Sequence, residues 1–311
     1  MQAFILTYYN LLKTTFKEFI DDNVVKLSAS LAYYTVFAIG PLIMVIISLT
    51  GLFFDKEDIT ARLYYQIQLL VGKTGAEQIF SIVNNIQSQN SDATLFSTVS
   101  IAILIFSATT VFADIQDSIN YIWSIRAKPK KGWLKYIQNR LLSFSIIIGL
   151  GFLLMVSLLV NTVTDALTDR LQRLFSEDMV DVFRIVNALI LYVIVSLLFG
   201  VIYRVLPDAK IKWHDAMRGA WFTGALFLLG KFLIGYYLGS STIGTTYGAA
   251  ASVVIILSWV YYTSIILYFG AEFTKVYALK LGGGIVPYDT AVFIVKREAK
   301  EMPDVKLVKE D

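Results

Sequence analysis

Long, uninterrupted apolar runs dominate the chain. Five of them contain no Asp, Glu, Lys or Arg, at residues 27–54, 93–113, 141–164, 185–203 and 249–271. A sixth run, at 220–239, contains a single charge, Lys231. The hydrocarbon core of a bilayer is about 30 Å thick and requires about 20 helical residues. A run that is continuous rather than alternating indicates helix rather than strand. The pattern therefore predicts an all-α membrane protein with six transmembrane helices.

These runs and their polar flanks define the expected domains. We predict spans at about 27–54, 93–125, 137–164, 185–206, 215–239 and 247–280, within one transmembrane domain over residues 27–281. Residues 1–26 carry apolar side chains at helical spacing and predict an amphipathic helix, which either lies along the membrane interface or packs on the bundle. Gly72 and Gly75 divide the apolar pattern of the loop 55–92 into two expected short helices. Residues 282–311 predict a polar, mobile tail.

The distribution of basic residues predicts the orientation. Segments 1–27, 126–140, 204–218 and 275–311 together hold 20 of the 27 Lys and Arg, whereas the segments between them, outside the spans, hold six. Basic residues collect on the cytoplasmic side of a membrane. We therefore expect a multi-pass protein of a bacterial inner membrane with both termini in the cytoplasm.

Composition excludes several classes of chemistry. Charged residues make up 16% of the chain, against about 25% in soluble domains. The absence of cysteine excludes disulfides, thiol nucleophiles and Cys-ligated metals, and the single histidine, His214, excludes a multi-histidine site. We accordingly expect no metal, no cofactor and no catalytic residues. The net charge of +3 is too small to indicate a nucleic-acid partner, so membrane lipids are the expected partners.

A small set of ionisable residues lies within or at the edges of the spans, which is costly in lipid and marks a packed interior or a hydrated path. The candidate residues share the inner third of the bilayer and are Asp114, Asp117, Asn120, Arg140, Arg204 and Glu272. The first three recur at three-residue intervals and therefore share one helix face. Two interpretations stay open: an ionic lock, in which Glu272 or the Asp pair neutralises Arg140 or Arg204, or a hydrated cavity for a charged head group or a proton.

Three further features join this set. Lys231 lies midway along the fifth span, where it either reaches towards the interface, finds an interior partner or binds an anionic group such as a lipid phosphate. Gly40 and Pro41 predict a kink in the first span, acting as a hinge or as a static packing contact. Tyr33 and Tyr34 belong to a polar strip in the inner half of that span and are expected to line the same pocket.

Several motifs resemble the YihY/BrkB family of bacterial inner-membrane proteins, whose members were once labelled ribonuclease BN. They are Ser30-Leu31-Ala32-Tyr33-Tyr34 with Gly40-Pro41-Leu42, Asn120 with Trp123, Leu206-Pro207 with Trp213, and Gly270-Ala271-Glu272-Phe273. The resemblance extends in order over residues 10–280. It implies a six-helix inner-membrane protein, and some relatives have been connected with lipid or lipopolysaccharide export.

Three functions follow as hypotheses. The first is a transporter or flippase-like exporter of an amphipathic, anionic, lipid-like substrate, with its polar pocket in the cytoplasmic half. The alternative is a non-transporting scaffold or envelope-assembly factor. The remote alternative is a membrane-associated ribonuclease, which the composition disfavours because RNA hydrolysis commonly relies on clustered His, Asp or Glu side chains.

Overall fold

The computed structural model describes residues 2–50, 56–88, 110–128, 177–240 and 251–295. The predicted third span, Arg140 and most of the second span lie outside the described residues. Within them the fold is built from long helices with two small two-stranded sheets.

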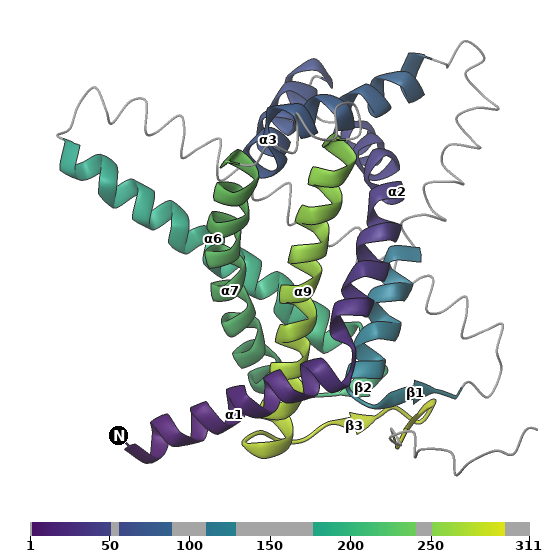
Figure 1. Cartoon of the computed structure of the whole chain (residues 1–311), viewed down its shortest axis with the longest axis vertical. Helices are drawn as coiled ribbons and strands as arrows, with labels where there is room; N and C mark the ends of the chain where they lie inside the picture. Colours follow the sequence, from purple (N-terminus) through teal and green to yellow (C-terminus); the bar gives the residue numbers. More distant parts are fainter. Residues whose placement is uncertain (1, 51–55, 89–109, 129–176, 241–250, 296–311) are drawn as a thin grey trace, which may run out of the picture.

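The helices form an upright group that is closed at each end by a further helix (Figure 1). α2 (Val24–Thr50), α7 (Trp213–Ser240) and α9 (Ala251–Lys280) stand roughly parallel, and α6 (Glu177–Val205) slants across them. α1 (Gln2–Asp21) lies crosswise at one end, and α3 (Lys56–Ser88) lies at the opposite end. A shorter helix over residues 110–122 follows the lower half of α2. α9 contacts α1, α2, α3 and α7, so it is the central helix of this group.

Three described helices are long and apolar enough to cross a membrane: Ala188–Val205, Trp213–Ile234 and Val253–Lys280. They coincide with the predicted fourth, fifth and sixth spans. The described apolar part of α2 is shorter, Val24–Ala38, although the helix itself continues through Gly40 and Pro41 to Thr50. The helical membrane architecture is therefore confirmed in outline. The full set of six spans and the kink stay predictions.

The prediction of two short helices in the loop 55–92 is wrong, because α3 is one helix of 33 residues that passes through Gly72 and Gly75. A glycine inside a helix costs about 1 kcal/mol relative to alanine. Leu63, before the glycines, and Ile79 and Val83, after them, pack into a single apolar cluster with Ile47 of α2 and Ile256 of α9. Tertiary packing on both sides of the glycines offsets their helix-breaking tendency.

Residues 285–295 are not a free tail. β3 (Val286–Pro287) pairs antiparallel with β2 (Ala209–Lys210), and β4 (Ala291–Phe293) pairs antiparallel with β1 (Ile125–Ala127). Gly284 turns the chain with a positive φ of 78°, a conformation that glycine adopts without steric cost. The segment after α9 thus ties together the connections that follow the 110–122 helix and α6. Only residues 296–311 of the predicted tail lie outside the described part.

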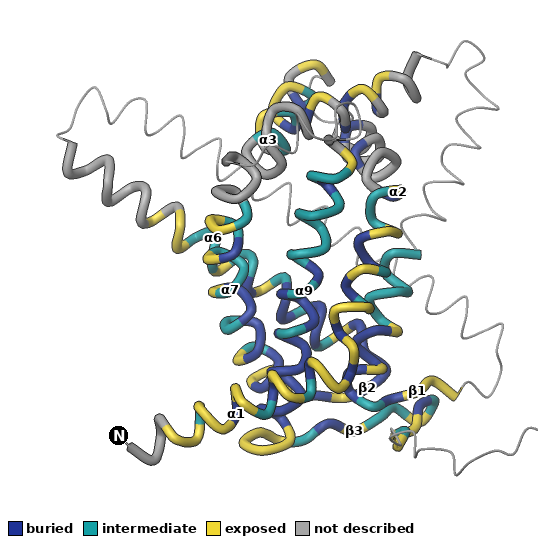
Figure 2. The backbone as a smooth tube through the Cα atoms, in the orientation of Figure 1, coloured by how far each residue is buried: buried dark blue, intermediate teal, exposed yellow. Residues whose placement is uncertain are grey.

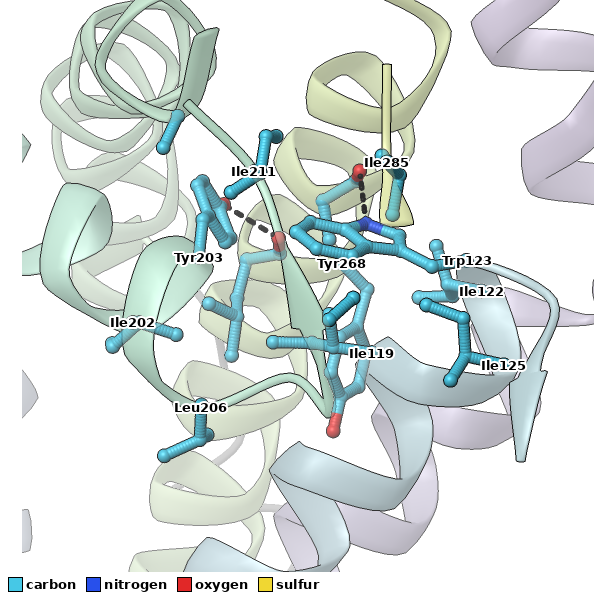
Figure 3. Packing of buried hydrophobic residues seen from close by; sticks show 14 of the residues in the cluster. Ile119, Ile122, Trp123, Ile125, Ile202, Tyr203, Leu206, Ile211, Tyr268 and Ile285 are labelled. Atoms are coloured by element: carbon cyan, nitrogen blue, oxygen red, sulfur yellow. Dashed lines mark hydrogen bonds between the residues drawn. The ribbon is translucent and has the colours of Figure 1, made fainter. Parts of the chain in front are cut away.

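The largest core lies near the α1 end, where buried residues concentrate (Figure 2). Trp123, Tyr203 and Tyr268 are its largest side chains. Trp123 Nε1 donates to the Ala271 carbonyl at 3.1 Å, and the Tyr203 hydroxyl donates to the Leu267 carbonyl at 2.8 Å (Figure 3). A Cβ at Gly270 would overlap the hydroxyls of Thr223 and Tyr203, so the glycine permits the close approach of α7 and α9.

The opposite placement of α1 and α3 gives a test of orientation. Because the chain has no cysteine, Asn10→Cys in α1 and Asn84→Cys in α3 each introduce a unique thiol at an exposed position. In intact spheroplasts, a membrane-impermeant maleimide is expected to label Cys at position 84 and to label position 10 only after lysis. Labelling of both positions before lysis would contradict a span between them.

Candidate functional site

Lys275 is the centre of a buried ionic network at the α1 end of the bundle. Its Nζ lies 2.9 Å from Glu272 Oε2, 2.6 Å from Glu18 Oε2 and 3.5 Å from Asp22 Oδ2. It also donates to the Ile122 carbonyl at 2.7 Å. Lys275, Glu272 and Asp22 are all at most 8% exposed. One ammonium therefore joins α9, the end of α1 and the end of the 110–122 helix, and we call this set the Lys275 lock.

In the Lys275 lock, Glu272 pairs with a residue other than Arg204 or Arg140, the two partners that the sequence suggested. Glu272 pairs with Lys275 three residues along its own helix, and among the described residues no ion pair joins it to Arg204. The guanidinium of Arg204 instead lies over the Trp213 ring, with its Cζ 5.9 Å from the ring centroid. Glu272 pairs with Lys275 because residues three apart on a helix lie on the same face. Arg204 belongs to a different helix, α6, and its guanidinium lies beside Trp213.

A second polar contact fixes the 110–122 helix to the connection between α6 and α7. Asn120 Nδ2 donates to Asp208 Oδ2 at 3.0 Å, and the Asp208 backbone N–H donates to Asn120 Oδ1 at 2.8 Å. Both residues are buried. Asn120 is thus a structural clamp in which its amide acts once as donor and once as acceptor.

Asp114 and Asp117 stand apart from the lock and form an acidic niche. Ser30 Oγ of α2 donates to Asp114 Oδ1 at 2.9 Å, while the buried Asp114 Oδ2 has no hydrogen-bond partner within the described ranges. Asp117 is exposed and interacts electrostatically with Asp208. The hydroxyl of Tyr268, on α9, interacts electrostatically with both niche carboxylates. Carboxylates with open acceptor positions can take up a proton, a cation or a ligand donor.

The other predicted residues lie elsewhere. Lys231 is half-buried on α7, about 20 Å along the helix axis from Arg218 at 1.5 Å per residue, so it is not part of the inner polar set. Tyr33 and Tyr34 are 59% and 39% exposed and pack edge to face with each other. Their role in lining a pocket stays a prediction, as does any role of Arg140.

Sequence reasoning missed three of the residues that complete these contacts: Glu18, Asp22 and Asp208. The spacing of Glu272 and Lys275 was a usable signal, because a Glu and a Lys three residues apart on one helix commonly interact. Asp208 directly follows the Leu206-Pro207 motif, but nothing local indicates that Asn120, 88 residues earlier, is its partner.

We expect Lys275→Met to destabilise the protein by about 3 kcal/mol or more, because it leaves the lock carboxylates without their cation. The measurement is SDS-induced unfolding in mixed micelles. Lys280→Met is the matched control on the same helix, since the exposed Lys280 donates to the uncharged Thr14 Oγ1 at 2.7 Å. The control is expected to stay within about 1 kcal/mol of the parent. Equal effects of the two variants would show that the lock is not stabilising.

Asn120→Asp is expected to destabilise the same protein by about 2 kcal/mol, because it removes the amide donor and sets two carboxylates against each other in a buried site. Asn10→Asp, at an exposed position of α1, is the control and should leave the unfolding midpoint unchanged. A midpoint for Asn120→Asp equal to that of the parent would contradict the clamp.

The comparisons with known proteins agree with this architecture. A family model described as virulence factor BrkB matches residues 15–287. Proteins named UPF0761 membrane protein are 25% identical in Delftia acidovorans, 26% in Tolumonas auensis and 28% in Methylibium petroleiphilum. The matches cover 88%, 81% and 84% of this chain, and 63%, 80% and 60% of the respective relatives.

Two of these three relatives are thus covered over less than two thirds of their own length. No solved structure matches the chain. The family model spans most of the sequence, including Asn120, Trp123 and Glu272. The resemblance drawn from the motifs is therefore confirmed, and the chain is a membrane protein that belongs to the BrkB family.

Proposed function

We propose that the chain is a transporter or flippase-like exporter that moves an amphipathic, anionic, lipid-like substrate from the cytoplasmic half of the inner membrane. The observation that carries the proposal is the buried Asp114 Oδ2, which accepts no hydrogen bond from the described residues although it lies between helices. Buried polar atoms without a partner are rare and cost about 1–3 kcal/mol each. A group that is retained at this cost fits a site where a proton, water or ligand binds during function.

The proposal divides the polar residues by role. The lock and the Asn120 clamp join separate helices through ion pairs and hydrogen bonds, so they hold the frame. Asp114 and Asp117 retain open acceptor positions and would exchange a proton or cation with the cytoplasm. An anionic head group requires a donor, and Arg204 offers one because its buried Nε makes no hydrogen bond to the part of the chain that the structure describes. Acidic and basic candidates therefore lie on different helices, with the acids on the 110–122 helix and Arg204 on α6.

A non-transporting scaffold is the second candidate, and the lock favours it. Lys275 joins α1, the 110–122 helix and α9 through three carboxylates and a carbonyl. A network that joins three parts of the chain in this way stabilises one arrangement of the helices. A scaffold needs only that arrangement and an exposed surface, whereas a transporter must open at one end while the frame persists.

The transport proposal predicts a measurable dependence on the niche. Liposomes holding the purified chain and fluorescently tagged phosphatidylglycerol are treated with dithionite, with and without a proton gradient, to follow movement of the tagged lipid. Asp114→Asn, Asp117→Asn and Arg204→Gln are expected to slow this movement. Asp21→Asn, an exposed acid at the end of α1, is the control and should match the parent. Size-exclusion profiles check that each variant is folded.

Absence of lipid movement with the folded parent under either condition would overturn the transport proposal and favour the scaffold. Equal rates for the parent, Asp114→Asn, Asp117→Asn and Arg204→Gln would overturn the roles proposed for these three residues. The same preparation incubated with RNA and magnesium is expected to leave the RNA intact, since we propose no enzymatic activity. Cleavage above that of a mock preparation would support the ribonuclease instead.

A further inference from the structure

An aromatic groove lies where α1 crosses α7 and α9. Its volume is about 290 Å³, and five rings line it: Tyr8, Trp221, Phe222, Phe273 and Tyr277. Leu12 of α1 completes the apolar wall, and Arg218 is the charged residue at its edge. Pockets that hold small ligands start at about 300 Å³. The groove therefore suits one extended apolar chain rather than a bulky molecule.

The floor of the groove is rigid. The Phe222 and Phe273 rings stack with their centroids 4.1 Å apart, and Phe273 stacks on Tyr277 at 6.4 Å. Phe273 and Tyr277 also pack with the buried Leu11 of α1 and Val276 of α9. Because the floor is held by contacts between three helices, it is preformed and an occupant needs little rearrangement to bind.

Arg218 gives the groove a charged end. Its Cζ lies 5.5 Å from the centroid of the Tyr277 ring, and its Nη2 lies 3.1 Å from His214 Nε2. Both Arg218 and His214 are exposed. A guanidinium held over a ring keeps most of its N–H donors available and matches the geometry of a phosphate.

α1 has a second apolar face that the described structure leaves uncovered. Leu11, Thr15 and Phe19 form the buried stripe, whereas Leu6, Tyr9, Leu12, Phe16 and Ile20 follow one another at three- and four-residue spacing and are 40–64% exposed. A third, polar face carries Lys13 and Lys17. A helix with a buried stripe, an exposed apolar stripe and a basic face is typical of one that lies in the interface of a membrane.

The exposed stripe and the groove are continuous, because Leu12 belongs to both. An acyl chain that covers the stripe therefore has direct access to the groove. We propose that the groove binds one acyl chain of an anionic phospholipid, with its phosphate at Arg218. This site is separate from the niche at Asp114 and Asp117, and it goes beyond the proposed transport because a bound lipid here is required by neither candidate function.

The test uses the intact chain in phosphatidylcholine nanodiscs that contain a small fraction of phosphatidylglycerol with a diazirine in its acyl chain. After irradiation, mass spectrometry locates the adducts. We expect them on the peptides that contain Tyr8 and Leu12 and on those that contain Trp221 and Phe222. Leu12→Trp, which fills the groove, should reduce the Trp221 and Phe222 adducts to background. Leu6→Trp is the matched control on the same exposed stripe and should leave them unchanged.

The head group is tested with Arg218→Gln and with a diazirine phosphatidylcholine. Arg218→Gln should lower the labelling by phosphatidylglycerol about fivefold, the effect of one exposed charged pair. Absence of adducts at Trp221 and Phe222, or equal loss with Leu12→Trp and Leu6→Trp, would overturn the groove as an acyl site. Equal labelling by the two lipids, unaffected by Arg218→Gln, would overturn the phosphate contact. This experiment does not measure lipid movement, so its outcome is independent of the test of the transport proposal.

Discussion

The fold at the α1 end depends on one buried cation. An ammonium at 8% exposure or less is unstable unless opposite charges and acceptors surround it, because the loss of hydration costs several kcal/mol. Lys275 meets this requirement with residues from three separate parts of the chain: Glu18 and Asp22 near the N-terminus, Ile122 at the end of a middle helix, and Glu272 on its own helix. Glu272 lies beside Lys275 on α9 itself, whereas the contacts with Glu18 and the Ile122 carbonyl form only when the three helices meet. The ion therefore selects one arrangement of α1, α9 and the 110–122 helix, in a region where apolar contacts alone would allow several.

Different kinds of contact hold the helices together at the two ends of the bundle. At the α3 end one apolar cluster joins three helices through Ile43, Ile59 and Ile256. At the α1 end the core is equally apolar but is fastened by ion pairs, side-chain clamps and short strands. The Lys275 lock and the Asn120 clamp therefore add directional polar contacts to the apolar core at the α1 end.

The parts of this structure that the sequence predicts are those set by local composition. Three long apolar runs become helices of membrane length because every backbone group must be bonded within its own segment in lipid. The shared face of Asp114, Asp117 and Asn120 follows from helical periodicity alone. In contrast, the continuity of α3 through Gly72 and Gly75 depends on packing against α2 and α9, and the pairing of β4 with β1 joins residues far apart in the chain.

The candidate site also combines features that local sequence predicts with features that depend on contacts between helices. Glu272 pairs with Lys275 on its own helix, whereas Asp114 accepts a hydrogen bond from Ser30 of α2. A sequence identifies which side chains are too polar for lipid, but the distribution of partners among them depends on distances between helices. Lys275 contacts Glu18 across more than 250 residues of chain, so no local pattern in α9 indicates that α1 supplies this partner. The pairing of these charges is therefore a property of the folded bundle rather than of any single helix.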